Sequence, residues 1–211
     1  MKEIDFMRFP KPNREQQIGK RTEKHREVAR RFDEAFFDGK RETGYGGYSY
    51  DGRWQAVAAR MAMHYGLADG SRILDVGCAK GFLVKDFRAI GMSAYGMDVS
   101  QYAIAKSEAP LYTVVGDALE LRTWPPSARY DLIVAINSLH NLDRPELVEV
   151  LRSIESIARY KYVVLDAWRT DQERDRMMAW NLTAKTMCHV DDWLALFREA
   201  SYTGDYAFFI P

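Results

Sequence analysis

Two aspartates and two glycines stand at spacings that suit the binding of a small ligand. Asp75 is followed by Gly77 and Gly81, and Asp98 comes 23 residues after Asp75. Glycines let a turn bend sharply, and they let a ligand approach the backbone N–H groups. An acid at about this distance meets the hydroxyl pair of a ribose in strand–turn–helix units. These residues therefore predict a site whose ligand carries a ribose.

The same turn excludes two common phosphate-binding loops. A dinucleotide fingerprint needs the pattern G-x-G-x-x-G, but Ala79 stands between Gly77 and Gly81. A P-loop needs G-x-x-x-x-G-K-[ST], and Lys85 does not fall in that frame. We therefore expect a ligand without a pyrophosphate, and a nicotinamide oxidoreductase is disfavoured.

Strands and helices alternate along the chain and must position these residues. Apolar runs bounded by turn residues predict strands at 72–76, 94–98, 112–115, 130–136, 161–166 and 206–210. Apolar residues at helical spacing predict helices at 14–38, 54–66, 82–90, 101–107, 145–158 and 191–197. Residues 39–53 are expected to form a loop, and 169–190 a long polar segment. This alternation indicates βαβ units and a parallel sheet.

Four motifs in a fixed order carry a resemblance to a known family. They are 75–81, Asp98, Asp117–Ala118 and 131–137. In that order and spacing, the chain resembles the class I S-adenosylmethionine-dependent methyltransferases over residues 55–211. One departure is Ala79, where many members have a third glycine, and we expect only a slightly less flexible loop there.

The resemblance implies an α/β fold and a domain division. The fold is a Rossmann-like three-layer sandwich with a mostly parallel sheet of six to seven strands and N-terminal helices. Residues 1–54 would form an arm, a helix and a loop, and 55–211 the domain that binds S-adenosylmethionine. The family usually ends in two strands after the last helix, and only one fits here.

The resemblance also implies which residues bind the cofactor. They are Asp75, Gly77, Cys78, Ala79, Gly81, Asp98, Val99, Asp117, Ala118 and Asn137. Asp75 would lie near the methionine amino group or its bridging water, and the turn would pass under the methionine part. Asp98 would accept from the ribose hydroxyls and Asp117 from the adenine amine, with Val99 on the adenine face. Cys78 is better explained by its small size than as a nucleophile.

His140 is the candidate catalytic residue. It follows the strand at 130–136 and could deprotonate a hydroxyl acceptor, since imidazole titrates near neutral pH. The alternative is a histidine that packs or caps the next turn. Methyl transfer from a sulfonium depends mainly on alignment, so a missing base would not exclude the enzyme.

An unusual loop precedes the predicted domain. The stretch 44–54 holds three tyrosines and four glycines. We expect a lid over the cofactor and the acceptor, with Tyr48 and Tyr50 facing the acceptor and Arg53 pairing with the methionine carboxylate. The alternative is a surface turn whose aromatic residues pack on the sheet.

Basic residues suggest where an anionic acceptor would bind. Arg169 and Lys185 lie in the long segment after the fifth strand and would suit such an acceptor. Nine Lys and Arg against three Glu fall between Arg8 and Arg31. This stretch is either a solvated helix face or a basic rim for a phosphorylated sugar or nucleotide. Pro10 and Pro12 suggest that the first dozen residues form a loose arm.

Composition narrows the function classes. The 211 residues carry a formal net charge of zero, which argues against a nucleic-acid substrate. No apolar run approaches a membrane span, no signal peptide is evident, and two cysteines imply no disulfide framework. The four histidines lack ligand spacing, so no metal is expected. The cytoplasm is the expected location, and a homodimer is left open.

These observations predict an S-adenosylmethionine-dependent methyltransferase acting on a small molecule. The acceptor atom is expected to be oxygen, and S-adenosylhomocysteine would be the product. Two alternatives stay open: transfer of another group from a modified S-adenosylmethionine, and a non-catalytic binding subunit that retains the fold.

Overall fold

A computed structural model describes residues 1–8, 21–123 and 129–210 of the chain. Its centre is a seven-stranded sheet with the order β3-β2-β1-β4-β5-β6, in which β7 also pairs with β5. The strands are β1 (Arg72–Val76), β2 (Ser93–Asp98), β3 (Thr113–Val115), β4 (Tyr130–Ile136), β5 (Ala158–Trp168), β6 (Cys188–His189) and β7 (Asp205–Phe209). Every pairing between them is parallel. The predicted α/β class and parallel sheet are confirmed.

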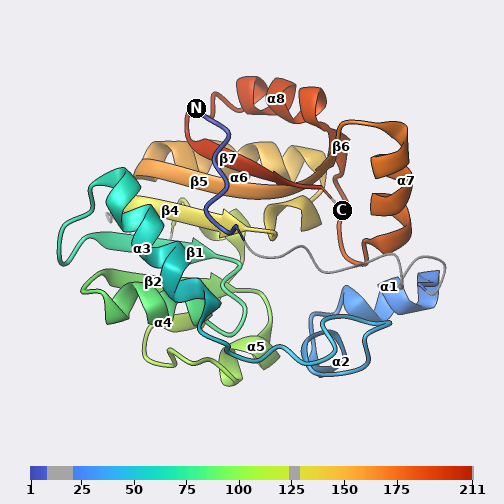
Figure 1. Ribbon diagram of the computed structural model, residues 1–211, viewed down its shortest axis with the longest axis horizontal. Coiled ribbons are helices and arrows are strands. Elements are labelled where there is room, and N and C mark those ends of the chain that lie inside the picture. Colours follow the sequence, from blue (N-terminus) through green and yellow to red (C-terminus); the bar gives the residue numbers. More distant parts are fainter. Residues whose placement is uncertain (9–20, 124–128, 211) are drawn as a thin grey trace.

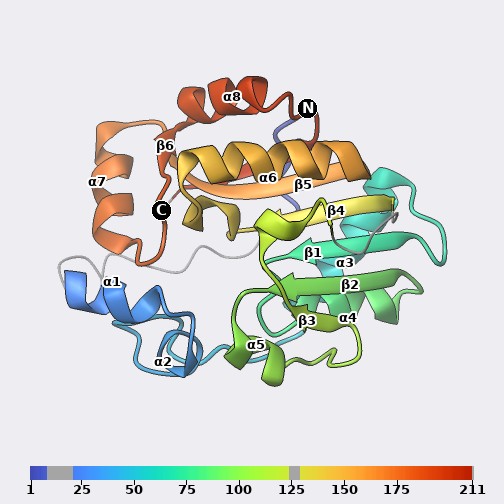
Figure 2. The same ribbon diagram turned by 180° about the vertical axis from the view of Figure 1, so that it is seen from behind.

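Helices cover both faces of this sheet. They are α3 (Arg53–Tyr65), α4 (Phe82–Ala89), α5 (Gln101–Ala105), α6 (Arg144–Ile157), α7 (Asp171–Trp180) and α8 (Val190–Glu199), besides two short N-terminal helices, α1 (Glu23–Ala29) and α2 (Glu34–Phe37). One hydrophobic cluster joins α3 and α4 to the sheet, and a second joins α6 and α8 to the opposite face. Figure 1 shows α3 in front of the sheet. Figure 2, the view from behind, shows α6 in front of the opposite face. The predicted three layers are present.

Local sequence explains where the main elements begin and end. Strand β1 is buried along four of its five residues, as expected of a strand covered on both faces. Helix α6 begins at a capping box, in which Asp143 N–H donates to the Glu146 carboxylate at 2.9 Å. From there Leu147, Leu151 and Ile154 recur on one face and are fully buried.

The prediction of one helix over 14–38 is wrong for residues 21–38. Residues 14–20, and also Pro10 and Pro12, lie outside the described residues. The chain forms α1 and α2 with a break between them, where Phe32 has φ +50°. A left-handed residue cannot continue a right-handed helix. Asp33 then starts α2, because its side chain accepts from Ala35 N–H at 2.9 Å. Charged residues recur at helical spacing through this stretch, so the sequence pattern did not indicate the break between α1 and α2.

The polar segment 169–190 contains structure that its sequence did not predict. Helix α7 begins at Thr170, whose side chain accepts from Glu173 N–H at 3.2 Å. Only Met177 of this helix is buried, so it lacks the apolar stripe that reveals most helices. After α8, β7 is the single strand that the described chain forms, as the sequence predicted.

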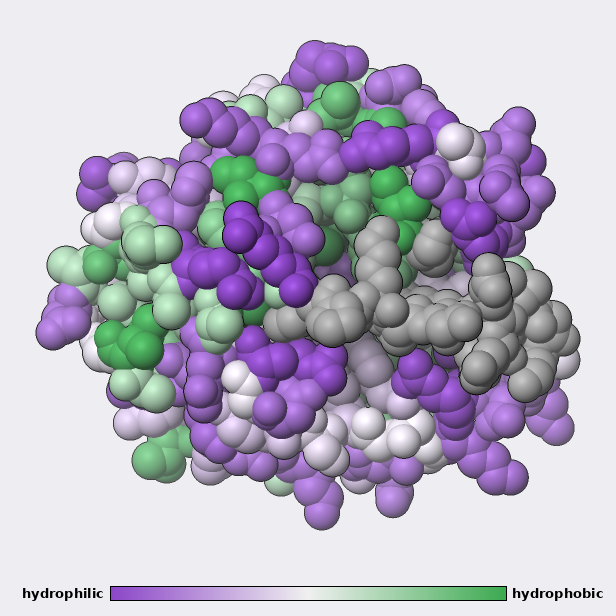
Figure 3. Space-filling view, in the orientation of Figure 1, coloured by the Kyte–Doolittle hydropathy of each residue, from purple (hydrophilic) through white to green (hydrophobic). Residues whose placement is uncertain are grey.

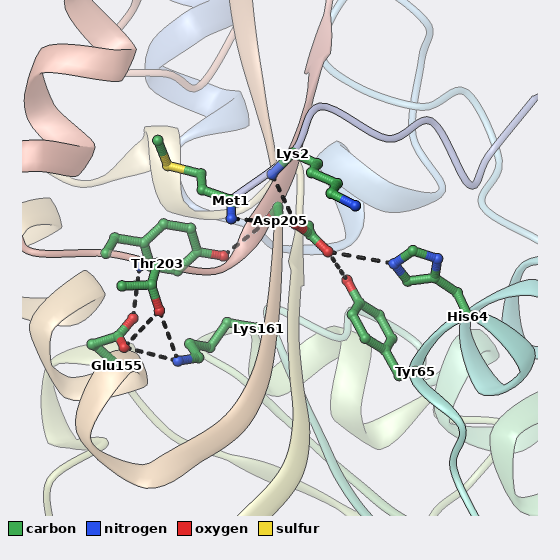
Figure 4. Close-up of polar contacts among 9 residues, drawn as sticks. Met1, Lys2, His64, Tyr65, Glu155, Lys161, Thr203 and Asp205 are labelled. Atoms are coloured by element: carbon green, nitrogen blue, oxygen red, sulfur yellow. Dashed lines mark hydrogen bonds and ion pairs between the residues drawn. The ribbon is translucent and has the colours of Figure 1, made fainter.

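The first residues extend the sheet beyond β7. Ile4 N–H donates to Tyr206 O at 2.7 Å, and Tyr206 N–H donates to Lys2 O at 3.0 Å. Figure 4 shows that the neighbouring Asp205 connects the N-terminal residues to α3. Its carboxylate accepts from Lys2 N–H at 2.8 Å and from the Tyr65 hydroxyl at 3.4 Å. The N-terminal stretch therefore runs beside β7 (Figure 1).

The described surface is mainly hydrophilic on the face shown in Figure 3. Hydrophobic side chains emerge there in separate patches among hydrophilic ones. None of the helices in the described ranges has the length and apolar character needed to cross a bilayer. The large apolar side chains are concentrated in the two interior clusters.

Candidate active site

A cavity of about 450 Å³ opens at the carboxyl edge of the sheet. The ends of β1, β2 and β4 form one side of it. The other side comes from residues 21–48, which include α1 and α2, and from the chain that follows α7. Figure 1 shows α1, α2 and α7 on the side toward which the strands point. This edge is where open α/β sheets bind small ligands.

The turn after β1 is a tight cradle. Gly77 has φ +81°, and a Cβ atom there would lie 2.2 Å from the Ser138 Cβ, so only glycine fits. Ala79 has φ +49°, a left-handed conformation that disfavours alanine. The Ser138 hydroxyl donates to Val76 O at 2.7 Å and fixes the loop after β4 against this turn. Ser138 lines the cavity, although no sequence signal singled it out.

Two acids stand beside the turn: Asp75 is buried and Asp98 is partly buried. The Asp98 carboxylate accepts from Ala79 N–H and from Ser100 N–H, each at 2.8 Å, and it lines the cavity. Asp75 is 5 % exposed, and no hydrogen bond joins its carboxylate to another described residue. Burial raises the pKa of Asp75 to about 8, and the charge of Asp98 adds to this effect. A cationic ligand group near Asp75 would favour its ionised form.

The ends of β2, β3 and β4 supply the next part of the wall. Val99 is half exposed and lines the cavity together with Asp117 and Ala118. The Asp117 side chain accepts from Leu119 N–H at 3.0 Å and caps a short 3-10 turn. Asn137 lines the cavity with φ +53°, a conformation that asparagine tolerates better than most residues.

A buried pair of titratable residues, His140 and Asp166, lies farther along the same wall. They are 3 % and 2 % exposed, and both line the cavity. The ring Nδ1 accepts from Asp166 N–H at 3.3 Å, while Nε2 lies 3.7 Å from Asp166 Oδ2. Because Nδ1 is an acceptor, the neutral ring carries its proton on Nε2, facing the carboxylate. Asn181 also donates to Oδ2, so the pair is held in one orientation.

The N-terminal segment is fastened to the turn by one ionic cluster. Lys80 Nζ contacts the two Asp38 carboxylate oxygens at 2.8 Å and 2.7 Å, and it also donates to Tyr48 O at 2.8 Å. Asp38 Oδ2 further accepts from the Tyr102 hydroxyl at 2.7 Å. Burial opposes ionisation, but these hydrogen bonds and the charge of Lys80 lower the pKa of Asp38 to about 2. Sequence reasoning missed this cluster, because nothing local relates position 38 to position 80.

Most of the sequence-predicted site residues meet at this cavity. Those that line it are Gly77, Ala79, Asp98, Val99, Asp117, Ala118, Asn137, Tyr48, His140 and Lys185. Asp75, Cys78 and Gly81 belong to β1 and its turn but do not line the cavity. Cys78 is buried, and a Cβ on Gly96 would lie 2.7 Å from its sulfur, so its small size matters for packing.

Three predicted site residues lie away from the cavity. Arg53 Nε donates to Asp51 at 2.7 Å, and the Tyr50 hydroxyl donates to Asp86 at 2.6 Å. Arg169 pairs with Glu3 at 2.7 Å. None of the three lines the cavity, and contacts with neighbouring side chains occupy each of them. Their ligand-binding roles stay predictions.

Other cavity residues escaped the sequence analysis or received no role there. Arg21, Arg30 and Arg41 line the cavity from the N-terminal side, and Trp180 and Asn181 line it from the end of α7. Two sequence features pointed to these regions: the excess of positive charge between Arg8 and Arg31, and the length of the segment 169–190. Neither signal shows which side chains face inward.

The fold and the cavity define a class of protein. A seven-stranded parallel sheet with helices on both faces and a ligand cavity at its carboxyl edge is the Rossmann-like fold of class I methyltransferases. A family model described as a methyltransferase domain matches residues 48–202 of the chain. The protein therefore belongs to the methyltransferase-domain family, whose methyl donor is S-adenosylmethionine and whose product is S-adenosylhomocysteine.

Solved structures agree with this fold. An S-adenosylmethionine-dependent methyltransferase from Archaeoglobus fulgidus matches 70% of this chain and 68% of its own, with 22% identity and a TM-score of 0.55. The magnesium protoporphyrin IX methyltransferase of Synechocystis PCC 6803, with bound S-adenosylhomocysteine, matches 70% of each chain, with 16% identity and a TM-score of 0.52. At these identities the likeness concerns the fold alone.

Two further comparisons set the scope of the match. An S-adenosylmethionine-dependent methyltransferase from Clostridium acetobutylicum ATCC 824 shares 16% identity over 51% of this chain, with a TM-score of 0.43. This chain spans 46% of that protein's length. A search of curated protein sequences gave no match.

The described residues hold no cluster of three or more His, Cys, Asp or Glu side chains that could bind a metal ion.

Proposed function

We propose that the protein transfers a methyl group from S-adenosylmethionine to a hydroxyl oxygen of a small molecule. The observation that carries the proposal is the meeting of a glycine cradle, two strand-end acids and a His–Asp pair at one cavity. Gly77 leaves room for a ligand at the backbone, and Asp98 and Asp117 face the same space.

The residues present fit the donor in their chemistry. Asp75 does not line the cavity itself, but it lies next to the turn that does, and its buried carboxylate has no hydrogen-bond partner in the described chain; we propose that the ammonium group of the donor supplies one. Asp98 would accept from the ribose hydroxyls, Asp117 from the adenine amine, and Val99 would cover the adenine face. When bound, S-adenosylmethionine supplies a methyl group on a sulfonium, which is a good leaving group.

The chain itself would position the acceptor and accept its proton. His140 and Asp166 form one unit, in which the protonated Nε2 faces the carboxylate and Asn181 holds the carboxylate in place. We propose that the Asp166 carboxylate of this pair receives the hydroxyl proton as the acceptor oxygen attacks the methyl carbon, and that His140, whose Nε2–H faces that carboxylate, orients it. Alignment of the two substrates supplies most of the remaining acceleration.

Calorimetric titration with S-adenosylmethionine, S-adenosylhomocysteine and NAD tests the proposal. We expect micromolar binding of the first two and none of NAD. Asp98→Ala should weaken S-adenosylhomocysteine binding by about 1.5–3 kcal/mol, because charged hydrogen bonds to the ribose are lost. Asp175→Ala is a matched control, since Asp175 is exposed and does not line the cavity.

Either of two results would contradict the proposal. If none of the three ligands binds, the result would favour a non-catalytic subunit that retains the fold. Unchanged affinity in the Asp98→Ala variant would mean that the ribose lies elsewhere. A small-molecule acceptor, the absence of a nucleic-acid substrate, a homodimer, a cytoplasmic location and a domain boundary at residue 54 stay predictions.

A further inference from the structure

The cavity divides into an acidic side and a basic side. Its carboxylates, Asp98, Asp117 and Asp166, come from the strand ends. Three arginines line it from the opposite, N-terminal side: Arg21, Arg30 and Arg41. The acids suit a cationic donor that is rich in hydroxyl groups. The donor carries a single carboxylate, so three arginines are more than it needs, and they therefore indicate a second ligand of negative charge.

Backbone carbonyl groups hold two of these arginines in place. Arg21 donates to Trp180 O and, at 3.4 Å, to Arg41 O, while Arg41 donates to Tyr45 O. At Arg41, a carbonyl oxygen fixes the guanidinium without cancelling its charge. Arg30 lies 3.1 Å from Glu23, an exposed pair that water screens. The basic side therefore keeps a positive potential toward the cavity.

Aromatic rings accompany the arginines along the same wall. Phe32 and Phe36 meet edge to face with centroids 5.3 Å apart, and Phe36 meets Tyr45 at 5.1 Å. Trp180 lies 5.4 Å from Phe209, and the Arg21 guanidinium lies 5.5 Å from the Trp180 ring centroid. All five rings line the cavity. Flat apolar walls of this kind favour a flat apolar ligand.

We infer that this basic aromatic side binds the methyl acceptor, and that the acceptor is an aromatic anion: a ring that bears the hydroxyl to be methylated together with a carboxylate or a phosphate. The inference rests on the proposed function and names its substrate class. The arginines would bind the anionic group, which planar guanidinium groups suit. The rings would stack on the aromatic part, and the hydroxyl would face His140 and Asp166.

The test measures binding to the protein saturated with S-adenosylhomocysteine, so that it does not depend on turnover. The probes are 4-hydroxybenzoate, phenyl phosphate, the neutral isostere 4-hydroxybenzamide and the non-aromatic anion glucose 6-phosphate. We expect the first two to bind, and the other two to bind weaker by about tenfold or more, because each lacks one of the two recognised features. Comparison of the carboxylate with the phosphate shows which anion is preferred.

Variants connect that preference to the named residues. Arg30→Met and Arg41→Met should each weaken 4-hydroxybenzoate binding by about tenfold while leaving S-adenosylhomocysteine binding unchanged. Arg41→Lys should recover part of the loss. Arg31→Met is the matched control: Arg31 neighbours Arg30 in sequence, is exposed and does not line the cavity.

The outcomes separate this inference from the proposed function. If S-adenosylhomocysteine fails to bind, the proposed function fails and the inference fails with it. Suppose that S-adenosylhomocysteine binds. If the affinity for 4-hydroxybenzamide or glucose 6-phosphate then equals that for 4-hydroxybenzoate, or if neither aromatic anion binds, only the acceptor class is overturned. An equal loss in the Arg31→Met variant would overturn the assigned arginines.

Discussion

At the scale of single residues, we expect Asp75 to link ligand binding to proton release. Its pKa lies at about 8, so the carboxyl is mostly protonated at pH 7 in the ligand-free protein. An ammonium group beside it would favour the ionised form. S-adenosylhomocysteine binding at pH 7 should therefore release a proton, which calorimetry in phosphate and Tris buffers would detect as different heats. Identical heats in the two buffers, once the heats of dilution are removed, would contradict this.

The same acid should affect stability in a defined direction. Because the folded-state pKa of Asp75 is raised above its ordinary 3.8, the wild-type protein should lose stability as pH rises from about 4 through about 8. Asp75→Asn has no charge to bury. Urea unfolding at pH 5 and pH 9 should show the variant gaining relative to wild type at the higher pH. A constant difference between the two proteins would argue against a buried, titrating Asp75.

Ala79 occupies a position that favours glycine. Its φ of +49° costs alanine about 1–2 kcal/mol, which glycine avoids at the expense of about 0.4–1 kcal/mol of unfolded-chain entropy. Ala79→Gly should therefore stabilise the protein slightly, by at most about 1 kcal/mol. Denaturant unfolding measures this, with the exposed Ala68→Gly as a control that should not be stabilised. Destabilisation by Ala79→Gly would show that the turn tolerates alanine without strain.

At the scale of elements, the ionic cluster of Asp38 and Lys80 holds the N-terminal segment over the cavity. Asp38→Asn should leave Lys80, which is 8 % exposed, without its carboxylate and weaken this attachment by about 2 kcal/mol. Hydrogen exchange at Gly47 and Tyr48 should accelerate, because their amides donate to Phe37 O and to the Asp38 carboxylate. Asp51→Asn, in the same loop, should leave both amides protected.

The pH dependence of this cluster has the opposite sign to that of Asp75. The pKa of Asp38 is lowered to about 2, so the cluster should contribute fully above about pH 4 and weaken as pH falls toward 2. Exchange at Tyr48, corrected for its intrinsic pH dependence, should rise over that window in the wild-type protein. The Asp38→Asn variant should show no such rise. If the exchange of Tyr48 also rises in the variant, a group other than Asp38 causes the effect.

The elements also show how far sequence alone could predict this protein. Strand β4 and helices α3 and α4 agree with prediction to within a residue, because apolar periodicity and glycine turns are local signals. The break at Phe32 and helix α7 were missed, since neither carries such a signal. In the site, Asp98 and Asp117 follow predictable strands. The partners Asp38 with Lys80 and His140 with Asp166 depend on tertiary packing, which spacing does not encode.

At the scale of the whole molecule, the first residues take part in the interior. Phe6 is 4 % exposed, and its ring lies 4.9 Å from that of Tyr162 and 5.9 Å from that of Tyr65. Phe6→Ala should destabilise the protein by about 3 kcal/mol, because it opens a cavity between the sheet and α3. Urea unfolding measures the loss. Met63→Ala, at an 80 % exposed site on α3, should change stability by less than about 0.5 kcal/mol.

S-adenosylhomocysteine affinity separates packing from binding in that experiment. Phe6 does not line the cavity, so the variant should bind S-adenosylhomocysteine as the wild-type protein does at a temperature where both are folded. A loss of affinity as large as the loss of stability would mean that the interior near the N-terminus is coupled to the site.

The pairing of residues 2–4 with β7 has a consequence for the order in which the protein is made. A ribosome delivers Ile4 about two hundred residues before Tyr206, the residue whose carbonyl its amide contacts. Until then Phe6 has no complete pocket, and the apolar segment around it stays exposed on the nascent chain. Contacts of such sequence separation form late and slow folding. Strand β7 thus secures a segment that the ribosome made about two hundred residues earlier.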